Sequence, residues 1–592
     1  MDSEKNSSGI PLYTRKNRKG LSSYAWLGFV LVALVASATV LQQCYSPDRA
    51  IAGRLGKAGA AAAQPKCPSV GIHRPETYDT YKKTLDKIMN DEGFRNESVS
   101  KMQHAVRIDT SSFDDLPLDV GSNLPLFEHF DVFLDSLRKD FPLFHEHTEL
   151  HKVNHHGLVY IWQGSDESLK PLLLMAHQDV VPISEDSLAK WEHGPFSGDY
   201  DGKYLYGRGS GDCKNLLISH FEAVEELIKA GFKPKRTVVF SYGFDEEILG
   251  PRNKNAEFIE ELYGAKSMYA VMDEGGVSMM EISGTTMAVV GTGEKGYLDV
   301  SLSIQKKGGH SSVPQDHTAI GMMGSLIVEI ENDKFPTYFV EKNPTFYQYV
   351  CLAEHAVDID PLLKQDILNS QIDEQANANV REFMNRDRFT SYAIKSTQAL
   401  DVIHGGVKYN ALPEFVELVV NSRVAVEESV TFAFKKFLKD AETIARQYNI
   451  GLSAQFPYSN GTEVVILPAT DVGIMTVKPI TILEPSPVTA ANDMHWKIFA
   501  GTARHVYEEL AYPDRFNNSD EQVVVTPGLG TGNTDTKLYW NLTDHIYRYR
   551  PGVLPSVNGN SHGINEYIEF DSHLQCIAFI FEYIQSVDEI QD

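Results

Sequence analysis

The fold is decided by residues 171–179, PLLLMAHQD, where an apolar run ends in a histidine and an acid. Two more apolar runs repeat this design, TVVFSYGFDEE at 237–247 and YAVMDE at 269–274. Unbroken apolar runs are typical of strands buried on both faces, so we expect a parallel sheet with its site at the carboxyl ends of the strands. Between the first two runs lie the glycine-rich turn GRGSGDCKN (207–215) and a helical pattern that Gly231 is expected to end. This order predicts a βαβ unit.

Each of these runs ends in side chains that can bind a metal ion. Taken singly, they have ordinary explanations: a strand-end histidine is usually hydrogen-bonded, an aspartate in a glycine turn usually caps it, and paired glutamates are usually solvated. Imidazole and carboxylates that converge at strand ends are, however, the nitrogen and oxygen donors that zinc accepts. The sequence therefore indicates a zinc site drawn from His177, Asp179, Asp212, Glu246, Glu247 and Asp273.

The composition excludes several classes of protein. The 592 residues include 80 acidic and 54 basic side chains, a formal net charge of −26, and this acid excess repels a phosphate backbone, so we expect no nucleic-acid partner. Apolar residues make up 42% of the chain, which is ordinary for a globular protein and excludes dominant disorder. The five cysteines contain no CxxC pair, so they indicate neither a thiolate zinc site nor a disulfide framework, and a single bridge is compatible with them.

The N-terminal part contains a candidate membrane anchor. Residues 24–41 carry no charge, follow a basic segment and are close to the minimum length of a spanning helix. The positive-inside rule then puts residues 1–23 in the cytosol and the rest of the chain in a lumen, which is type II topology. A cleaved signal peptide is the alternative, because the triplet ASA at 36–38 resembles a cleavage site, but the apolar run is long for one. Residues 42–68 are rich in Ala, Gly and Pro and predict a linker.

Four glycosylation sequons follow the anchor, as expected if the body of the protein is lumenal. Their asparagines are Asn96, Asn460, Asn517 and Asn541.

Eight motifs along the chain resemble those of the M20 family of dinuclear zinc peptidases. In order they are MAHQDVVP, GRGSGDCKN, GFDEE, MDEGG, KKGGHSSVP, GGVKYNALPE, GNTDTKLYWNLT and SHGINEY. The similarity extends from about Cys67 to the C-terminus. It implies an α/β catalytic domain with a mixed, largely parallel sheet flanked by helices, interrupted by a smaller α+β lid of the dimerisation type. On that layout residues 69–293 and 484–592 form the catalytic domain, and residues 294–483 form the lid.

The resemblance also implies the metal ligands. Two Zn²⁺ ions per subunit would be bound, with His177 and Asp273 on the first, Glu247 and His562 on the second, and Asp212 bridging both.

Two further residues of the catalytic domain receive roles from the resemblance. Glu246 would act as general base, and Asp179 would hydrogen-bond His177 and set its tautomer. The peptide bond between Asp212 and Cys213 would be cis. For Cys213 itself, a packed thiol is favoured over a nucleophile, because no histidine base is assigned to it.

From the lid, His310 would hydrogen-bond the oxyanion and Asn410 would reach the substrate. In dimeric relatives this histidine comes from the other subunit. For Arg423 two roles stay open, packing within the lid or contact with the substrate carboxylate. Lys537 is a candidate for that carboxylate from the catalytic domain, where many relatives carry arginine. Residues 352–400 show little periodicity and either lengthen the lid or shape the access channel.

The activity implied is that of a zinc carboxypeptidase, which removes the C-terminal residue of short peptides with glycine in the penultimate position, in a vacuolar lumen. The alternative is an amidase that acts on N-acyl amino acids with the same ligands. A catalytically inactive receptor is disfavoured, because every ligand position carries a competent residue. The resemblance also suggests a homodimer formed through the lid. It further suggests ubiquitin on three cytosolic lysines for sorting, namely Lys5, Lys16 and Lys19.

Overall fold

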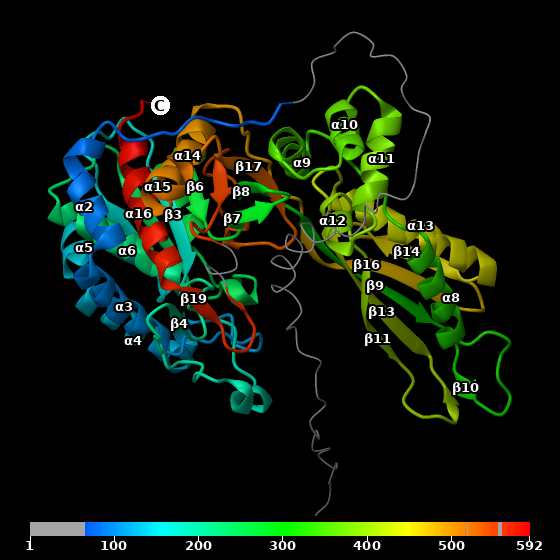
Figure 1. The fold of residues 1–592 in the computed structure, drawn as a ribbon. Coiled ribbons are helices and arrows are strands. Elements are labelled where there is room, and N and C mark those ends of the chain that lie inside the picture. Colours follow the sequence, from blue (N-terminus) through cyan, green and yellow to red (C-terminus); the bar gives the residue numbers. More distant parts are fainter. Residues whose placement is uncertain (1–65, 518, 554–558, 592) are drawn as a thin grey trace, which may run out of the picture.

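The computed structural model describes residues 66–517, 519–553 and 559–591. The expected anchor at 24–41 and the three cytosolic lysines lie outside these residues. Within the described ranges, no helix has both the length and the hydropathy needed to cross a membrane. The described chain forms two lobes, a larger one around a nine-stranded sheet and a smaller one around a six-stranded sheet (Figure 1).

The larger sheet is mixed, and its central strands are parallel, as the buried apolar runs predict. The strand order is β1 (Glu149–Val153), β2 (Gly157–Trp162), β5 (Val238–Gly243), β3 (Leu172–His177), β6 (Ala270–Asp273), β18 (Ile546–Arg548), β8 (Thr285–Glu294) and β17 (Val523–Gly530), with β7 (Val277–Ile282) paired to β8. β5, β3, β6 and β18 all run in one direction, while β1 and β2 continue the sheet antiparallel. The predicted βαβ unit is therefore confirmed as β3, α6 and β5.

Helices cover both faces of this sheet, because its central strands are apolar on both sides. Along β3, Leu172 and Leu174 belong to one core and Leu173 to the other. The first face is covered by α2 (Tyr78–Asn90), α3 (Glu92–Arg107), α4 (Glu128–Asp140), α5 (Pro142–His147), α6 (Lys214–Lys229), α14 (Met494–His505) and α16 (Phe570–Asp588). The second is covered by α7 (Asn255–Tyr263). Helix α6 is buried on nearly all sides, because α3 and α16 pack on it as well as the sheet.

The smaller lobe is a second sheet with two helices on one face. Its strands lie in the order β11 (Ala399–Gly405), β13 (Phe415–Val424), β9 (Gly296–Gln305), β16 (Ile474–Leu483), β14 (Gly451–Gln455) and β15 (Glu463–Leu467). The helices are α8 (Ala319–Asn332) and α13 (Val430–Tyr448), whose apolar side chains share one core with the sheet. At the far end of this lobe, β10 (Gly309–His310) pairs with β12 (Ala411–Leu412) (Figure 1). We refer to this lobe as the lid.

The polar region whose role the sequence left open folds into short helices with a small core of their own. They are α9 (Pro344–His355), α10 (Pro361–Asn369), α11 (Glu374–Met384) and α12 (Arg388–Ala393). Side chains of Asn343, Asp360, Asp373 and Asp387 cap their N-termini. Helix α9 packs against β8 and β17 of the larger sheet, so these helices lie at the junction of the two lobes.

The remaining elements are short and connect the others. They are η1 (Gly121–Phe127), η2 (Glu185–Lys190), β4 (Tyr204–Tyr206), η3 (Glu246–Ile248), η4 (Val506–Ala511), α15 (Pro513–Phe516), η5 (Asp535–Leu538) and β19 (Tyr567–Glu569).

The single bridge that the cysteine count allowed is present, between Cys67 and Cys351 on α9. It joins the start of the described chain to the helices at the junction. We expect Cys351→Ser to lower the free energy of unfolding by about 2–4 kcal/mol, because the cross-link restricts the unfolded chain. Urea unfolding with and without reductant measures this. Reductant should destabilise the wild type and leave the variant unchanged; an equal response of both proteins would contradict the prediction.

Candidate active site

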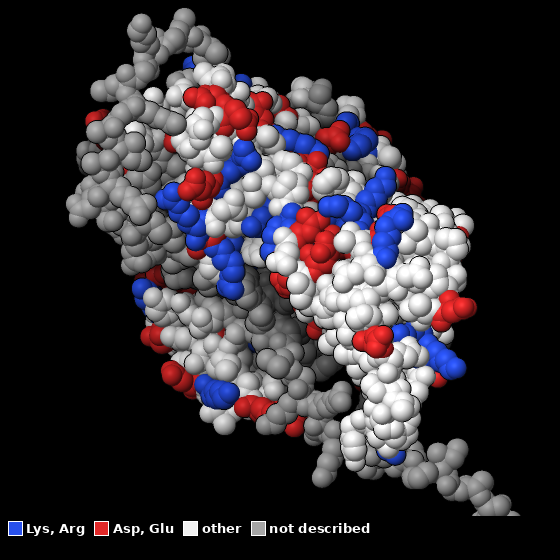
Figure 2. Space-filling model, turned by 90° about the vertical axis from the view of Figure 1, so that its right-hand side faces the viewer, with Lys and Arg blue, Asp and Glu red and all other residues white. Residues whose placement is uncertain are grey.

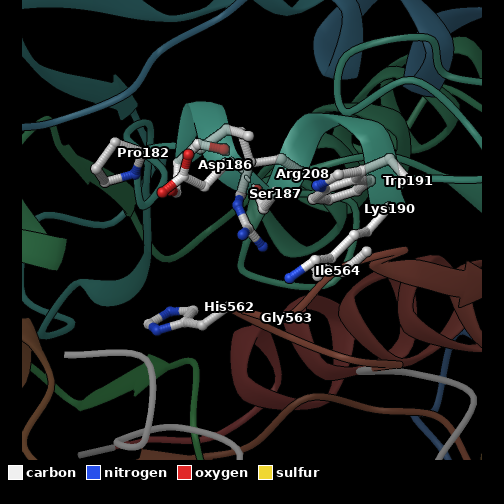
Figure 3. Close-up of a pocket in the computed structure, with 11 residues that line it drawn as sticks. Pro182, Asp186, Ser187, Lys190, Trp191, Arg208, His562, Gly563 and Ile564 are labelled. Atoms are coloured by element: carbon white, nitrogen blue, oxygen red, sulfur yellow. Dashed lines mark hydrogen bonds between the residues drawn. The ribbon is translucent and has the colours of Figure 1, made fainter. Parts of the chain in front are cut away.

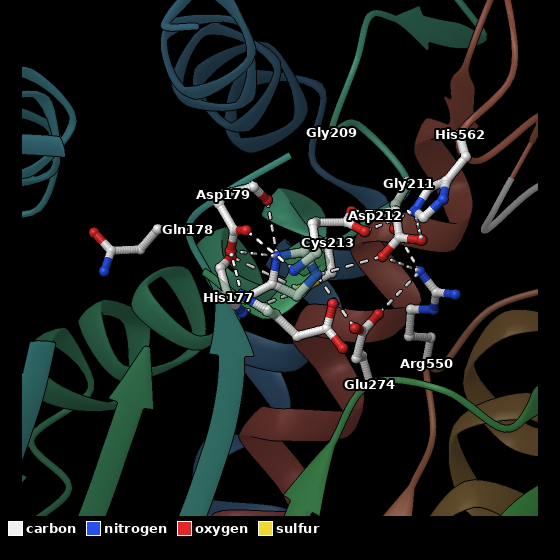
Figure 4. A network of polar contacts seen from close by, with 12 residues as sticks. His177, Gln178, Asp179, Gly209, Gly211, Asp212, Cys213, Glu274, Arg550 and His562 are labelled. Carbon is white, nitrogen blue, oxygen red and sulfur yellow. Dashed lines mark hydrogen bonds and ion pairs between the residues drawn. The ribbon is translucent and has the colours of Figure 1, made fainter. Parts of the chain in front are cut away.

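The carboxyl ends of neighbouring parallel strands bring the candidate residues together (Figure 4). β3 ends at His177 and β6 ends at Asp273, while β5 leads into the 3-10 turn η3, which begins at Glu246. Asp212 lies in the glycine-rich turn before α6. Adjacent residues on an extended strand point to opposite sides, so the turn is what allows Glu246 and Glu247 to be buried in the same cluster.

Asp212 lies between two histidines. Its Oδ1 atom is 3.5 Å from Nε2 of His177, and its Oδ2 atom is 3.3 Å from Nε2 of His562. A second carboxylate approaches each histidine: Oε1 of Glu274 is 3.2 Å from His177 Nε2. On the other side, Oε2 of Glu247 is 3.0 Å from His562 Nε2. The chain thus forms two adjacent donor groups that share Asp212.

The donor group around His177 contains Glu274 where the sequence assigned Asp273. Among the described residues, Glu274 belongs to a group with His177 and Cys213 in which all donor atoms lie within 4.8 Å of one another. No such group among the described residues includes Asp273. The Oδ2 atom of Asp273 is buried and has no hydrogen-bond partner. Asp273 is the last residue of β6, and Glu274 follows it outside the strand. Glu274 is therefore a further candidate ligand on the His177 side, and the assignment of Asp273 stays a prediction.

Asp179 holds the turn that carries the two glutamates. Its Oδ1 atom accepts a hydrogen bond from the backbone N–H of Glu246 at 3.1 Å, and its Oδ2 atom accepts one from that of Glu247, also at 3.1 Å. The Ser112 hydroxyl donates to Oδ2 at 2.7 Å. His177 Nδ1 donates to the backbone carbonyl of Asp179 at 2.8 Å, whereas the carboxylate is 3.4 Å away. Asp179 thus sets the tautomer of His177 as expected, but through its carbonyl oxygen.

Glu566 holds the glycine-rich turn from the other side. Its Oε1 atom accepts hydrogen bonds from the backbone N–H groups of Gly209, Gly211 and Asp212 at 3.1, 2.9 and 3.1 Å. Its Oε2 atom accepts a hydrogen bond from the Arg208 guanidinium. Both side chains of this ion pair are almost completely buried. The position of Asp212 therefore depends on a carboxylate far along the chain.

Arg550, just after β18, adds a positive charge to the cluster. Its Nη1 atom donates to the carbonyl oxygen of Gly211 at 2.8 Å and lies 3.5 Å from Asp212 Oδ1 and 3.5 Å from Glu274 Oε2. The peptide bond between Asp212 and Cys213 is cis, as the resemblance implies. Burial raises the pKa of the Cys213 thiol, which fits a packed side chain better than a nucleophile.

Burial makes most of these acids hard to ionise. It raises the pKa of Glu274 to about 7, and it raises the pKa of Glu246 well above its ordinary value, with Glu274 and Glu247 adding to the effect. Burial acts in the same direction on Asp212, but Arg550 and the two histidines outweigh it and hold the pKa of Asp212 well below its ordinary value. A bound cation would favour the charged form of each of these acids.

The donor chemistry fits bound metal ions. Three buried polar atoms of the cluster have no hydrogen-bond partner: Nε2 of His177, Oδ2 of Asp212 and Oδ2 of Asp273. The first two point at the neighbouring donors across 3.2 to 3.5 Å. Imidazole nitrogens and carboxylate oxygens in this number are the ligands of a divalent transition metal. The residues that would hold it are His177, Asp212, Glu247 and His562, with Glu274 and Asp273 as the two candidate acids on the His177 side.

The lid residues assigned from the sequence are not brought to this cluster. His310 and Asn410 lie next to each other, since Asn410 precedes the residue that pairs with His310. Both are exposed at the far tip of the lid (Figure 1). His310 Nδ1 is 2.8 Å from Ser312 Oγ.

Arg423 and Lys537 lie nearer to the cluster. The Arg423 guanidinium stacks on the Tyr297 ring at 4.4 Å and donates to Asn533 Oδ1 at 2.7 Å, which corresponds to the packing alternative and joins the lid to the catalytic lobe. Lys537 is partly exposed on η5 and lowers the pKa of neighbouring Asp535, whose pKa burial raises.

A pocket opens beside His562 (Figure 3). Its volume is about 370 Å³. Trp191 and Ile564 contribute apolar surface, and Lys190 and Arg208 contribute positive charge. Asp186 lines the same pocket, so ligands that reach His562 can extend into a space with apolar walls and with charges of both signs.

Four residues of the site were missed by the sequence analysis. They are Glu274, Arg550, Glu566 and Ser112. Glu274 could have been found, because it stands next to an assigned acid in the motif MDEGG. Glu566 could also have been found, because it lies in the motif SHGINEY with His562. Arg550 and Ser112 act through contacts between distant segments, for which the sequence carries no local pattern.

We expect Glu566→Ala to lower the free energy of unfolding by about 3–5 kcal/mol, because it leaves the buried Arg208 without its counter-charge. The matched control is Glu569→Gln, which removes a surface ion pair with Lys203 and should cost less than about 1 kcal/mol. Urea unfolding measures both. Equal urea midpoints for the two variants would show that the buried pair of Arg208 and Glu566 contributes no more stability than the surface pair.

The sequence matches the family model described as Peptidase family M20/M25/M40 over residues 173–586. It is 40% identical over 530 residues to carboxypeptidase S from Saccharomyces cerevisiae, and the match covers 89% of each chain. It is 28% identical over 501 residues to an N-fatty-acyl-amino acid synthase/hydrolase from Mus musculus, covering 83% of this chain and 88% of the other.

The fold is also found among solved structures. An M20 family metallo-carboxypeptidase from Sulfolobus solfataricus superposes with a TM-score of 0.53 at 17% identity, covering 83% of this chain and 99% of the other. The family model alone spans most of the chain, and the yeast relative extends the match to nearly its full length. The chain therefore belongs to peptidase family M20/M25/M40.

Proposed function

We propose that this protein is a metal-dependent carboxypeptidase that removes the C-terminal residue from short peptides of the Gly-X type. The observation that carries the proposal is the pair of donor groups that share Asp212, with Glu246 beside the ligand Glu247. The 40% identity to the yeast carboxypeptidase supports the choice of peptide substrates.

We propose that the donor groups hold two Zn²⁺ ions. His177 and either Glu274 or Asp273 would serve one ion, Glu247 and His562 the other, and Asp212 both. When bound, such ions supply polarisation of the scissile carbonyl and a lower pKa for water. Two dications exceed the charge of three carboxylate ligands, so the centre would be cationic and would attract the anionic end of a peptide.

Glu246 would carry the proton. The ion pairs of His177 and His562 are formed with other carboxylates, which leaves the Glu246 side chain for the role of base, while the Asp179 carboxylate fixes the Glu246 backbone N–H at 3.1 Å. Burial raises the pKa of Glu246 well above its ordinary value, and a raised pKa makes its carboxylate a stronger base for the attacking water and lets it return the proton to the leaving amine. For the substrate carboxylate, Lys537 is the candidate on the catalytic lobe, because Arg423 is already engaged with Asn533.

Paired variants of the two adjacent glutamates test this function. Glu246→Gln should keep the metal content and lower kcat for a blocked Gly-Leu dipeptide by about 10²–10⁴-fold, because it removes only the base. Glu247→Gln should lower the metal content as well, because it removes a ligand. Zinc per chain, measured by mass spectrometry, separates the two. A Glu246→Gln enzyme as fast as the wild type would refute the assignment.

The same assay distinguishes the alternative substrate class, which the similarity to the mouse N-fatty-acyl-amino acid synthase/hydrolase favours. A carboxypeptidase should hydrolyse the blocked dipeptide with a higher kcat/KM than N-fatty-acyl-leucine. The reverse order would make an amidase of N-acyl amino acids the better description of the same site.

We further propose that two copies form a dimer through their lids. β11 is the edge strand of the lid sheet, and its Val402 and Ile403 side chains are 40% and 54% exposed. In the turn that follows, Val407 and Tyr409 are fully exposed. Figure 2 views the molecule from the lid side, and the lower right of this view is a broad area with few charged side chains. A paired edge would cover this apolar surface and place His310 of one copy where the other copy could use it.

Complementation tests this arrangement. His310→Ala and Glu246→Gln should each be inactive alone, and a refolded or co-expressed mixture should recover about a quarter of the wild-type activity, because half of the dimers are hybrids with one intact site. Size-exclusion chromatography with light scattering gives the oligomeric state. A monomer in solution, or a mixture that stays inactive, would contradict the exchange of His310.

We propose a vacuolar lumen as the location, with the N-terminal segment as anchor. Disulfides persist in oxidising compartments, and the bond between Cys67 and Cys351 supports such a compartment. The four sequon asparagines, Asn96, Asn460, Asn517 and Asn541, are all exposed and therefore accessible to glycosylation. Sorting through ubiquitin on Lys5, Lys16 or Lys19 is part of the same proposal and concerns residues outside the described ranges.

A further inference from the structure

A second cluster of ligand-type side chains lies at the opposite end of the central strands. Asp493 and His495 stand at the start of α14, and His545 precedes β18. β6 and β18 are parallel, so their carboxyl ends face the active site, and the His495 ring contacts Tyr269, the residue before β6. From Tyr269 to the active-site end of β6 the strand spans roughly 13 Å. The second cluster is thus separate from the active site.

The geometry of the cluster matches a metal site. Nε2 of His545 is 2.9 Å from Oδ2 of Asp493, and Nδ1 of His495 is 3.9 Å from the same oxygen. The three donor atoms all lie within 4.8 Å of one another. A tetrahedral zinc ion with bonds of about 2.0–2.1 Å has its ligand atoms about 3.3 Å apart, which lies within the observed range. The ligands would need only small side-chain shifts.

The two imidazole rings are stacked side by side, with centroids 3.6 Å apart and planes inclined by 9°. Their nitrogens therefore approach the same carboxylate oxygen from adjacent positions. Among the described residues, the other groups of this kind either belong to the active site or include Cys67, which is bound in the disulfide. This is the one such group in that part of the chain without an assigned role.

The backbone holds the ligands in place independently of any metal. Oδ1 of Asp493 accepts the Trp496 N–H at 2.9 Å as the cap of α14, which leaves Oδ2 for the histidines. The His545 carbonyl accepts the Val271 N–H at 2.8 Å, and the next residue, Ile546, donates its N–H to the Thr489 hydroxyl at 2.9 Å. Ligands on such rigid elements lose little freedom when they bind an ion.

The cluster is also accessible. The side chains of His545, His495 and Asp493 are 23%, 26% and 32% exposed, so an ion and a water molecule as fourth ligand can reach it. Two neutral imidazoles and one carboxylate carry a single negative charge, which suits a divalent transition metal better than Mg²⁺ or Ca²⁺, because those ions prefer oxygen ligands.

We propose that Asp493, His495 and His545 form a second metal site that binds a divalent transition metal, for which Zn²⁺ serves as the probe ion. The ion links the first turn of α14 to the segment that enters β18. Because it binds the folded state and not the unfolded chain, it stabilises the contact between this helix and the sheet. It takes no part in peptide hydrolysis, since it lies at the other end of the strands.

Metal counting on the full-length protein, purified and dialysed against buffered Zn²⁺, tests the site. The double variant His495→Ala/His545→Ala should hold one zinc ion per chain fewer than the wild type, keep kcat/KM for the blocked dipeptide, and lose part of the zinc-dependent rise in Tm. Asp493→Asn should lose the same ion while preserving the helix cap, because asparagine also caps. This second variant keeps the test valid if the double variant folds poorly.

The matched control is His104→Ala, which removes a surface histidine 2.9 Å from Asp140 and should leave the zinc count unchanged. Equal zinc counts in the wild type and both cluster variants would overturn the proposal, as would an equal loss in His104→Ala. The test compares the zinc count of each variant with that of the wild type, and a loss of one ion is expected. Metal in the active site adds equally to both counts, so the result does not depend on it.

Discussion

The structure depends on the concentration of buried carboxyl groups at one end of its larger sheet. Asp212, Glu246, Glu247 and Glu274 meet where water is largely excluded, and burial raises the pKa of the three glutamates. The nearby positive charge of Arg550 and two histidines compensates only part of this cost. Bound cations would neutralise the carboxylates. The same cluster that costs the metal-free chain stability would therefore favour metal binding.

A second kind of carboxylate keeps this cluster in shape. Asp179 and Glu566 are as deeply buried, but their oxygens accept hydrogen bonds from backbone N–H groups of the segments that carry the ligands. Asp179 fixes the turn after β5, and Glu566 fixes the glycine-rich turn before α6. Both turns can therefore hold their side chains close together against mutual repulsion. The site thus contains two kinds of buried acid. Asp179 and Glu566 hold the backbone, whereas Asp212, Glu246, Glu247 and Glu274 are available to metal ions and substrate.

The lid is attached to the catalytic lobe, but its tip does not cover the site of its own chain. Arg423 joins the lid to the catalytic lobe by its contacts with Tyr297 and Asn533, and α9 packs on the larger sheet. The tip that carries His310 lies away from the metal-type ligands of the same chain. A histidine assigned to catalysis and exposed so far from its own site is understandable if a second copy of the chain completes it.

The sequence by itself determined the parallel strands, the βαβ unit, the cluster of acids at the strand ends and the family motifs. These are local: a strand buried on both faces is apolar throughout, and its last residues must lie at the sheet edge. Only the tertiary structure showed that Glu274 lies beside His177, that Asp179 acts on His177 through a carbonyl oxygen, and that Arg550 and Glu566 contact the site. It alone also joined Asp493 and His495 to His545. The reason is physical: these choices depend on which way a side chain turns and on contacts between segments far apart in the chain, and neither leaves a pattern among neighbouring residues.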